Sequence, residues 1–140
     1  MSLVIEETQD LAACHALRRT VFIEEQGVPE AEELDDQDGG AIHLLARLDG
    51  RPVGSARLIL KGETGKIGRV CVLKDQRGTG LGAALMRAAL DALRARPGIS
   101  HATLGSQVHA IAFYEKLGFV AEGPIYDDAG IPHRDMRRAL

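Results

Sequence analysis

The chain has 140 residues, of which 45% are hydrophobic and 26% are charged. This length suits one globular domain over residues 1–140, and the composition excludes the low hydrophobicity and high charge of a disordered chain. The formal net charge is −3, from 17 basic and 20 acidic residues, so no basic field can attract phosphate backbones and we expect no nucleic-acid partner.

The N-terminus and the cysteines indicate a cytoplasmic protein. Met1 is followed by Ser-Leu-Val-Ile-Glu-Glu, which lacks the basic residues and long apolar run of a signal peptide, and no later run is long enough to span a membrane. Cys14 and Cys71 form no C-x-x-C pair, so we expect reduced, small core residues rather than nucleophiles or a disulfide. We therefore expect no membrane partner.

The first forty residues predict a short strand, a helix and a surface segment. Leu3 to Ile5 is a short apolar run, after which Thr8 can cap an amphipathic helix over about residues 9–25. A glycine and a proline then end the helix. Residues 30–40 are acidic and turn-rich, so we expect a loop or a short helix on the surface.

Three apolar-rich runs then predict the middle of a sheet. Residues 42–48 and 52–60 flank Asp49-Gly50, a dipeptide that supplies the positive φ angles of a type I′ turn, so these two strands should pair antiparallel. The third run, residues 67–73, contains the continuous apolar segment Val70-Cys71-Val72 and is typical of a central strand.

The second half of the chain alternates helices and strands. Residues 81–96 predict a helix with cations near its end, and residues 102–104 predict a short strand. A helix over residues 110–117 follows, and from residue 119 onward two strands flank a turn at residues 127–130. This order predicts an α/β (mixed α+β) fold, in which helices pack on the faces of a mixed sheet.

A glycine-rich loop joins the third apolar run to the following helix. It reads Lys74-Asp75-Gln76-Arg77-Gly78-Thr79-Gly80-Leu81-Gly82. The free N–H groups and the dipole of a helix N-terminus attract anions, and glycines let a phosphate approach the main chain. The loop therefore predicts a phosphate site, to which Arg77 adds positive charge. A tight turn without a ligand is the alternative.

Two nucleotide-binding motifs fit this loop poorly. A P-loop needs a lysine and a serine or threonine after its last glycine, where this chain has Ala83-Ala84. Gly78, Gly80 and Ala83 match the G-x-G-x-x-A of dinucleotide-binding folds. However, four polar residues separate the strand from the glycines, and no acid lies near residues 103–107 to bind a ribose.

The loop resembles the CoA pyrophosphate signature R-x-x-G-x-G/A of the GNAT acetyltransferases, through Arg77, Gly80 and Gly82. Residues 104–119 resemble a second landmark of that family, a strand followed by a helix that ends in F-Y-x-x-x-G-F. Gln107 stands where many relatives have asparagine. The resemblance to the ElaA-like branch covers essentially the whole chain and includes Arg18, Val21-Phe22, Glu25-Gln26, Pro29, Asp35, Asp36, Gly130-Ile131-Pro132-His133 and Met136.

The resemblance implies a GNAT fold. In this fold a mixed six- or seven-stranded sheet splays open between the strand of residues 70–72 and the strand of residues 102–104, and the pantetheine arm of acetyl-CoA lies in the gap. Acetyl-CoA is the expected co-substrate, and no metal is expected. The implied cofactor-binding residues are Val70, Cys71, Val72, Arg77, Gly78, Thr79, Gly80, Leu81, Gly82, Gln107 and Phe113.

The implied chemistry is direct attack of an amine on the thioester, without a covalent enzyme intermediate. Tyr114 is the expected general acid, because the pKa of a phenol, about 10, lies above the pKa of a thiol, about 8.5. An ordinary core tyrosine is the alternative. Glu25, His109 and His133 are the candidate bases, and a water molecule could serve instead.

Several points stay open at the level of the sequence. Arg57 and Arg69 interrupt apolar strands and either pair with the acidic segment Glu30–Asp38 or remain solvated at an edge. An acyl-CoA sensor without turnover is an alternative function, as is an acyl-homoserine-lactone synthase, which has a comparable F-x-x-E-Q pattern. The acceptor, an amine on a small molecule, peptide or protein, and the choice between monomer and homodimer are encoded in no recognisable feature.

Overall fold

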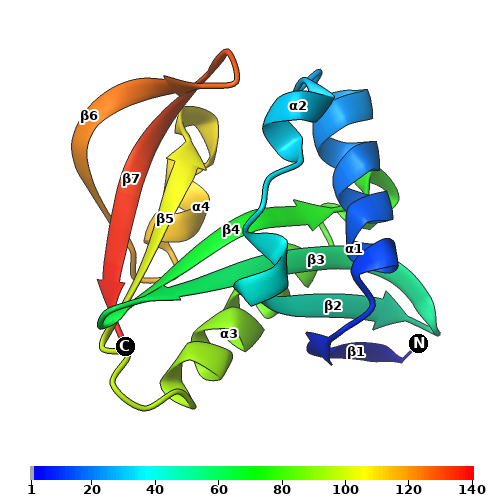
Figure 1. The fold of residues 1–140 in the computed structure, drawn as a ribbon, viewed down its shortest axis with the longest axis horizontal. Coiled ribbons are helices and arrows are strands. Elements are labelled where there is room, and N and C mark those ends of the chain that lie inside the picture. Colours follow the sequence, from blue (N-terminus) through cyan, green and yellow to red (C-terminus); the bar gives the residue numbers. More distant parts are fainter. Residues whose placement is uncertain (1) are drawn as a thin grey trace.

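Seven strands form one sheet in the computed structural model, which describes residues 2–140 (Figure 1). The strand order is β1-β2-β3-β4-β5-β7-β6, and neighbouring strands are antiparallel except for the central pair, β4 and β5. This mixed sheet, with β4 at its centre, confirms the expected fold class. The strands are β1 (Leu3–Thr8), β2 (Ile42–Leu48), β3 (Arg51–Lys61), β4 (Thr64–Val72), β5 (His101–Gln107), β6 (Val120–Asp128) and β7 (Ile131–Ala139).

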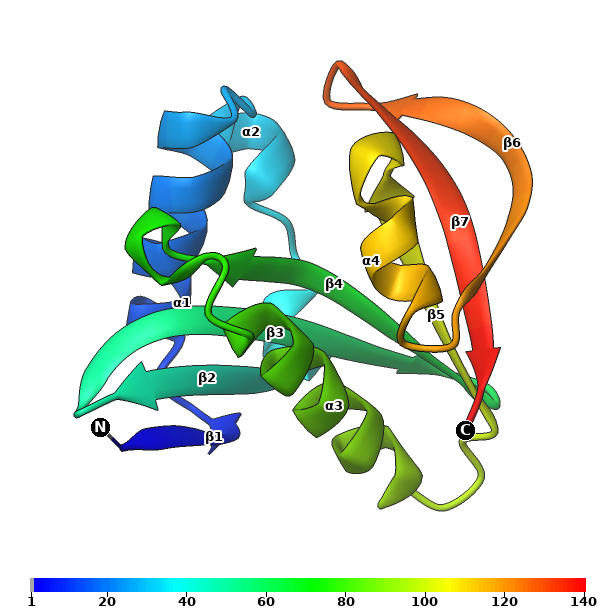
Figure 2. The same cartoon turned by 180° about the vertical axis from the view of Figure 1, so that it is seen from behind.

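Helices cover both faces of the sheet. The first two helices lie on one face and the last two on the other, as the opposite views in Figures 1 and 2 show. Within residues 2–140 no helix is long and apolar enough to cross a membrane. The helices are α1 (Leu11–Arg18), α2 (Glu30–Glu33), α3 (Leu81–Arg94) and α4 (Ile111–Glu115), with a π-helical segment η1 (Arg19–Glu25) and the 3-10 turns η2 (Asp38–Gly40), η3 (Lys74–Gln76) and η4 (Val108–Ala110).

The N-terminal helix differs from the prediction in its cap and its winding. Helical structure runs from Leu11 to Glu25, close to the predicted range, but its second half is the wider π-helical segment η1. Thr8 is not the cap: the Asp10 carboxylate accepts a hydrogen bond from the Ala13 N–H at 3.1 Å and caps α1. π-helical turns often mark functional positions, and η1 ends beside the site described below.

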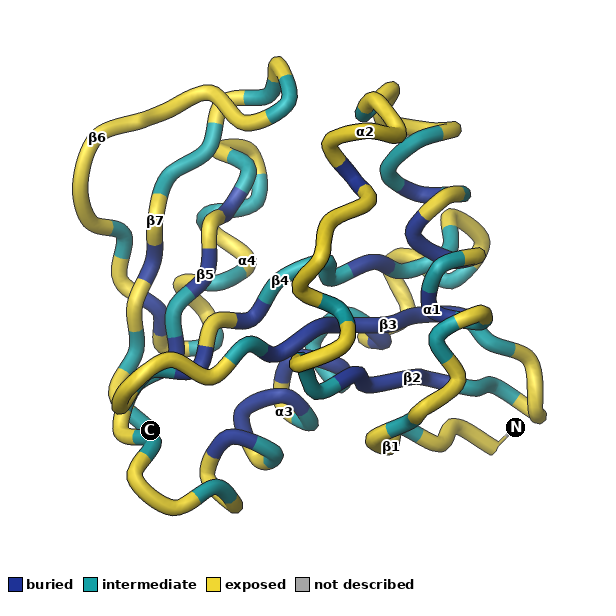
Figure 3. The backbone as a smooth tube through the Cα atoms, in the orientation of Figure 1, coloured by how far each residue is buried: buried dark blue, intermediate teal, exposed yellow. Residues whose placement is uncertain are grey.

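The hydrophobic core has two parts, one on each face of the sheet, and the buried stretches of the central strands separate them (Figure 3). The buried residues of α3 recur at helical spacing, as the sequence predicts, and are Leu81, Leu85, Met86, Ala89, Leu90 and Leu93. On the opposite face Cys14, Leu17 and Val21 pack with Leu45 and Cys71. Both cysteines are free and buried, which confirms their expected place in the core.

Two tight hairpins shape the ends of the sheet. Asp49 and Gly50 have φ angles of 51° and 85°, as a type I′ turn requires, and they join β2 to β3 as predicted. Ala129 and Gly130, with φ angles of 53° and 80°, join β6 to β7 within the predicted turn. The second hairpin brings the ends of β6 and β7 beside the site.

The lengths of β5 and α4 differ from those that the sequence predicts. β5 extends to Gln107, beyond the predicted end at residue 104, because β7 pairs with it along its whole length up to the pair Gln107 and His133. The helix predicted over residues 110–117 is shorter, since α4 ends at Glu115 and follows a 3-10 turn. Main-chain pairing with β7, which the residue pattern does not show, sets the end of β5.

β4 and β5 pair over only three residues each. Residues 64–66 of β4 pair with residues 101–103 of β5, and beyond them β4 stays with β3 while β5 stays with β7 (Figure 1). The register between β3 and β4 also shifts, because Ser55 faces Cys71 whereas Arg57 faces Gly68. The extra residue in β4 is a bulge, which bends the strand. The expected splay between β4 and β5 is thus confirmed.

Gly65 keeps α3 close to the point where the two strands separate. A Cβ atom at this position would overlap the side chain of Leu93, which is fully buried. We expect Gly65→Ala to lower the free energy of unfolding by about 1–3 kcal/mol, because the packed core cannot yield. Gly68→Ala in the same strand is the control, since a Cβ there meets no atom within 4 Å. Equal losses in chemical denaturation would contradict this account.

Candidate active site

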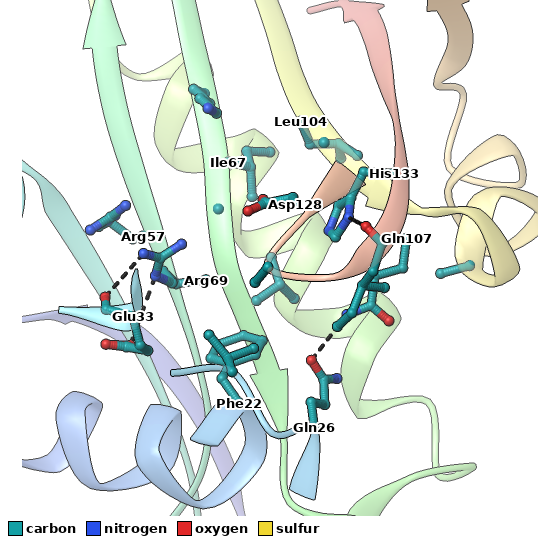
Figure 4. A pocket seen from close by; sticks show the side chains of 18 of the residues that line it. Phe22, Gln26, Glu33, Arg57, Ile67, Arg69, Leu104, Gln107, Asp128 and His133 are labelled. Carbon is teal, nitrogen blue, oxygen red and sulfur yellow. Dashed lines mark hydrogen bonds and ion pairs between the residues drawn. The ribbon is translucent and has the colours of Figure 1, made fainter. Parts of the chain in front are cut away.

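A cavity of about 320 Å³ lies where β4 and β5 diverge (Figure 4). Its walls come from η1 and α2, from β3, β4 and β5, from α4, and from the β6–β7 hairpin. Of the predicted site residues, Val70, Gln107, Tyr114 and His133 line this cavity. The other predicted residues lie outside it, so the structure divides the predicted site into two parts.

The glycine loop forms the second part, at the N-terminus of α3. Gly78 and Gly80 have φ angles of +79° and +86°, a conformation that favours glycine. α3 begins at Leu81 without a side-chain cap, so its first N–H groups have no partner within the helix. A Cβ on Gly80 would meet no atom within 4 Å and would project into open space. The exposed loop therefore has the geometry in which a phosphate can reach the main chain.

Two side chains of the loop make contacts within the protein. The Thr79 hydroxyl donates a hydrogen bond to the Gln76 carbonyl oxygen at 2.7 Å and closes the turn. Leu81 points into the core and is only 5% exposed. At these two positions a ligand would meet the main chain rather than the side chain.

Neighbouring aromatic residues of α4 link the two parts of the site. Phe113 lies at the glycine loop, where its ring is 3.5 Å from the position of a Cβ on Gly82. Tyr114 lines the cavity, and the two ring centroids are 5.0 Å apart. α4 therefore extends from the glycine loop to the cavity.

Arg77 holds the loop against the N-terminal half of the chain. Its Nη2 lies 2.9 Å from Glu25 Oε2, and its Nε donates to the Val72 carbonyl oxygen at 3.1 Å. Glu25, a predicted candidate base, is thus an ion-pair partner at the loop and does not line the cavity. The sequence separates these two residues by more than fifty positions and gave no sign of their contact.

The β5-facing edge of β4 lacks a strand partner beyond Lys66. Main-chain groups of residues 70–72 that point away from β3 therefore face the divergence of the two strands. The bulge adds to them, because Arg69 has a φ of 49° and the extra residue leaves the ladder. The Cys71 side chain, by contrast, is buried, and burial raises the pKa of its thiol to about 11. Only its main chain can contact a ligand.

Tyr114 presents a protonated phenol to the cavity. Its ring packs edge-to-face on Phe113 and Phe119, with centroid distances of 5.0 Å and 6.2 Å. Burial raises the pKa of this phenol, so the hydroxyl keeps its proton at neutral pH. Within the described part of the chain, residues 2–140, the hydroxyl makes no hydrogen bond. It is therefore available to a bound molecule.

His133 has a defined tautomer. Its Nδ1 lies 2.8 Å from the Ile131 carbonyl oxygen, which can only accept, so Nδ1 carries the proton. In the neutral imidazole the lone pair then belongs to Nε2, which makes no hydrogen bond to any residue that the structure describes. The ring stacks on Tyr126 at a centroid distance of 5.9 Å and lines the cavity. His133 thus offers a free basic nitrogen.

Gln107 bridges the two arms of the split. Its Nε2 donates to Gln26 Oε1 at 3.0 Å, and its Oε1 lies 2.6 Å from Nε2 of His109. Gln26 follows η1, so the first bond joins the N-terminal segment to the end of β5 (Figure 4). His109 orients this amide and does not itself line the cavity. Sequence reasoning missed Gln26 in this role, although it lies beside Glu25.

A buried cluster of charged residues forms the wall opposite the hairpin. Arg18 is 1% exposed and its Nε pairs with Glu33, while its Nη1 donates to Asp38 Oδ1 at 3.0 Å. Arg57 Nη1 donates to Asp35 Oδ1 at 2.8 Å and to Asp38 Oδ1 at 3.0 Å. The acidic segment is thus folded onto β3. The expectation that it lies on the surface is wrong for Glu33, which is 3% exposed.

Arg69 completes this cluster from β4. Its Nη2 donates to the Glu33 carbonyl oxygen at 3.0 Å and lies 3.3 Å from Asp35 Oδ2. Of the two alternatives for Arg57 and Arg69, the structure therefore shows pairing with the acidic segment. The sequence missed Arg18 as a member, because a helical residue fifteen positions away from Glu33 has no local signal of its partner.

Comparisons with known proteins agree with this geometry. Residues 7–140 match the family described as the acetyltransferase (GNAT) domain. The chain is 35% identical to the uncharacterized N-acetyltransferase YjcF of Bacillus subtilis, with 98% of both chains covered. An acyl-CoA N-acyltransferase of Pseudomonas aeruginosa has a similar crystal structure, with a TM-score of 0.85, 36% identity and 99% of each chain covered. The crystal structure of Escherichia coli ElaA gives a TM-score of 0.88 at 29% identity, with 98% of this chain and 99% of that chain covered.

The similarity to the P. aeruginosa acyltransferase extends over 99% of this chain, and so covers its divided sheet, its glycine loop and the residues that line its cavity. The chain belongs to the GNAT acetyltransferase family. The resemblance to ElaA that the sequence motifs indicate is confirmed as well, since the E. coli protein is 33% identical over 134 residues, which cover 93% of this chain and 88% of ElaA.

Asp38 makes the stability of this wall dependent on pH. Burial alone would raise the pKa of its carboxyl, but hydrogen bonds from Arg18, His15 and Arg57 hold this pKa well below its usual range. A lowered folded-state pKa stabilises the fold at a pH above the unfolded-state pKa, and this contribution disappears as the pH falls towards the folded-state value. We expect the free energy of unfolding to fall as the pH drops below about 5.

Asp38→Asn isolates this contribution. The variant should be less stable at neutral pH by roughly 3 kcal/mol, because Arg18 and Arg57 remain buried with one carboxylate fewer, and its acid dependence should be shallower than that of the wild type. Urea unfolding at several pH values measures both effects. Asp91→Asn is the control, since its pair with Arg94 is exposed and should contribute about 0.5 kcal/mol or less. Parallel pH profiles for Asp38→Asn and wild type would contradict the assignment.

Proposed function

We propose that this protein transfers the acetyl group of acetyl-CoA directly to a primary amine. The observation that carries the proposal is the position of α4, which puts Phe113 at the glycine loop and Tyr114 in the cavity. One elongated molecule with phosphates at one end and a reactive group at the other can contact both parts at once. Membership of the GNAT family and the name of the P. aeruginosa relative support an acyl-CoA as this molecule.

The residues of the loop fit a pyrophosphate. The N–H groups of the first turn of α3 are uncapped, and the position of Gly80 opens on free space that a side chain would fill. Along the gap, main-chain groups of Val70 and Cys71 on the edge that lacks a strand partner can pair with the amides of an extended chain, as another strand would, whereas the Val72 carbonyl oxygen already accepts from Arg77. Acetyl-CoA would supply the thioester, and a main-chain N–H at the bulge can stabilise negative charge on its carbonyl oxygen.

Tyr114 is the proposed proton donor to the leaving thiolate. Its hydroxyl is protonated at neutral pH because burial raises its pKa, and no neighbouring residue of those described occupies it. A phenol is also a weaker acid than a thiol, so the proton is held until a basic sulfur forms. Tyr114 lines the same cavity as Val70, at the edge of β4 that lacks a strand partner, and this supports a donor close to the thioester.

His133 is the proposed base that takes a proton from the attacking ammonium group. Among the three candidates, only His133 lines the cavity with an unoccupied nitrogen lone pair. Glu25 is paired with Arg77, and the Nε2 of His109 is bonded to Gln107. The Ile131 carbonyl oxygen fixes the tautomer that leaves Nε2 basic, which is the usual way in which a catalytic imidazole is oriented.

Acetyl transfer and its dependence on Tyr114 can be tested together. A panel of primary amines is incubated with acetyl-CoA, and free thiol is measured. We expect turnover with at least one amine, and we expect Tyr114→Phe to lower it by about ten- to a thousandfold at saturating acetyl-CoA while CoA still binds. Only the hydroxyl is removed, so the packing on Phe119 should survive. Acetyl-CoA binding without turnover for any amine would favour a sensor, and full activity of Tyr114→Phe would make this residue structural.

The base is tested by a matched pair of histidine variants. His133→Gln should lower turnover by about a hundred- to ten-thousandfold, because it removes the free lone pair in the cavity. His109→Gln should keep most of the turnover, since this side chain acts only on Gln107. Turnover is compared at saturating acetyl-CoA after a check of the fold by circular dichroism. A larger loss for His109→Gln would overturn the assignment, and no loss for either variant would point to water as the base.

A further inference from the structure

One wall of the cavity carries two arginines that the proposed chemistry does not use. Arg57 on β3 is 5% exposed, and Arg69 on β4 lies beside it (Figure 4). Both residues line the cavity. The Nε atom of each is buried and has no hydrogen-bond partner among residues 2–140. Buried guanidinium groups are normally fully hydrogen-bonded, so these two are incompletely satisfied, and a further partner can be bound only through their remaining N–H groups.

The contacts of these arginines leave specific donors free. Among residues 2–140, Arg57 hydrogen-bonds only through Nη1, to Asp35 and Asp38, and Arg69 only through Nη2, while the Arg69 Nε lies 3.8 Å from Glu33 Oε1 as an ion pair without a hydrogen bond. The Nη2 of Arg57 and the Nη1 of Arg69 make no hydrogen bond to any residue in the described range. The positive charge of Arg57 also contributes, after burial, to a lowered pKa of Arg69. An anion between the two groups would relieve this repulsion.

The backbone conformation of Arg69 is strained, and the contacts of its guanidinium group hold it in this conformation. Arg69 has a φ of 49°, in the left-handed region that is unfavourable for a residue with a Cβ. It lies at the bulge of β4, where the chain departs from the ladder. Such strain persists where surrounding contacts impose it, and it is concentrated at binding sites. The contacts here are those of the Arg69 guanidinium with the acidic segment.

The opposite wall carries a carboxylate and the proposed base. Asp128, at the tip of β6, and His133, on β7, line the cavity on the side of the hairpin (Figure 4). The side chain of Asp128 has no hydrogen-bond partner within the described part of the chain. An ammonium group would be attracted to this side, next to the proposed base, while an anionic group would be attracted to the arginines.

We infer that the acceptor is an amine that also carries a carboxylate, and that Arg57 and Arg69 bind this carboxylate. The inference rests on the proposed acetyl transfer and adds the class of acceptor. The three arginines of the wall and the carboxylates of Glu33, Asp35 and Asp38 cancel in formal charge. The wall therefore binds an anion through directed N–H groups rather than through a net positive charge. Two donors from two residues suit the two oxygens of a singly charged carboxylate.

Matched acceptors test the inference. Acetyl transfer is measured for β-alanine and β-alaninamide, and for lysine and lysinamide, which differ only in the carboxylate. We expect Arg69→Gln to reduce the ratio of kcat/KM for acid over amide by about 10- to 100-fold relative to wild type, as expected for the loss of a charge-assisted hydrogen bond. Comparing the two ratios cancels the difference in basicity between the amines. Arg51→Gln is the control, because its pair with Asp75 is exposed and lies outside the cavity.

If Arg69 has a purely structural role, Arg69→Gln should lower kcat/KM equally for the acid and the amide of each pair. The ratio would then be unchanged, which would overturn the inference. Arg69→Lys serves if the glutamine variant melts early: it keeps the charge but loses the planar fork, and the same fall in the ratio is expected. A preference of the wild type for phosphoethanolamine over β-alanine would also overturn the carboxylate assignment.

A binding measurement separates this inference from the proposed function. The protein saturated with CoA is titrated calorimetrically with N-acetyl-β-alanine and with its amide, neither of which can react as an amine. We expect the acid to bind at least tenfold more tightly, and Arg69→Gln to abolish this preference. This result without turnover of any amine would support the carboxylate site and refute acetyl transfer. Equal affinities in the wild type would refute the site, whatever the outcome of the transfer assay.

Discussion

The early end of the pairing between β4 and β5 is the constraint on which the rest of this structure depends. Only three residues of each strand form the parallel ladder, and beyond them the sheet divides into two arms. Main-chain polar groups at a free strand edge need partners, so the divergence creates an edge that a ligand can satisfy. Without this divergence the sheet would be continuous and would enclose no cavity at its centre.

Both arms are stabilised independently, which keeps the divergence open. β5 is paired with β7 along its length and β4 with β3, so neither strand needs the other beyond the ladder. The bulge at Arg69 bends β4 beyond the ladder. The hydrogen bond between Gln26 and Gln107 crosses the opening and can be exchanged for contacts to a bound molecule.

The buried charges have a positional rather than a stabilising role. Desolvation of ion pairs offsets much of their attraction, so the cluster of Arg18, Arg57 and Arg69 with its carboxylates is weak support for a high stability. It fixes the acidic segment against β3 and β4 and thereby closes one side of the cavity. A hydrophobic wall of the same shape could close the cavity equally well, but it would offer no directed donors to a substrate.

The sequence by itself determined the elements and the anion loop. Apolar periodicity fixed the buried face of α3, Asp49-Gly50 fixed a hairpin, and the glycines at positions 78 and 80 fixed a turn with positive φ, because these features depend on neighbours within a few residues. Tertiary structure alone decided that Arg18 meets Glu33, that Arg77 pairs with Glu25, and that His133 rather than His109 lines the cavity. Those contacts join residues far apart in the chain, and they depend on strand order, on the bulge in β4 and on the point where two strands separate. No local pattern of residues encodes these quantities.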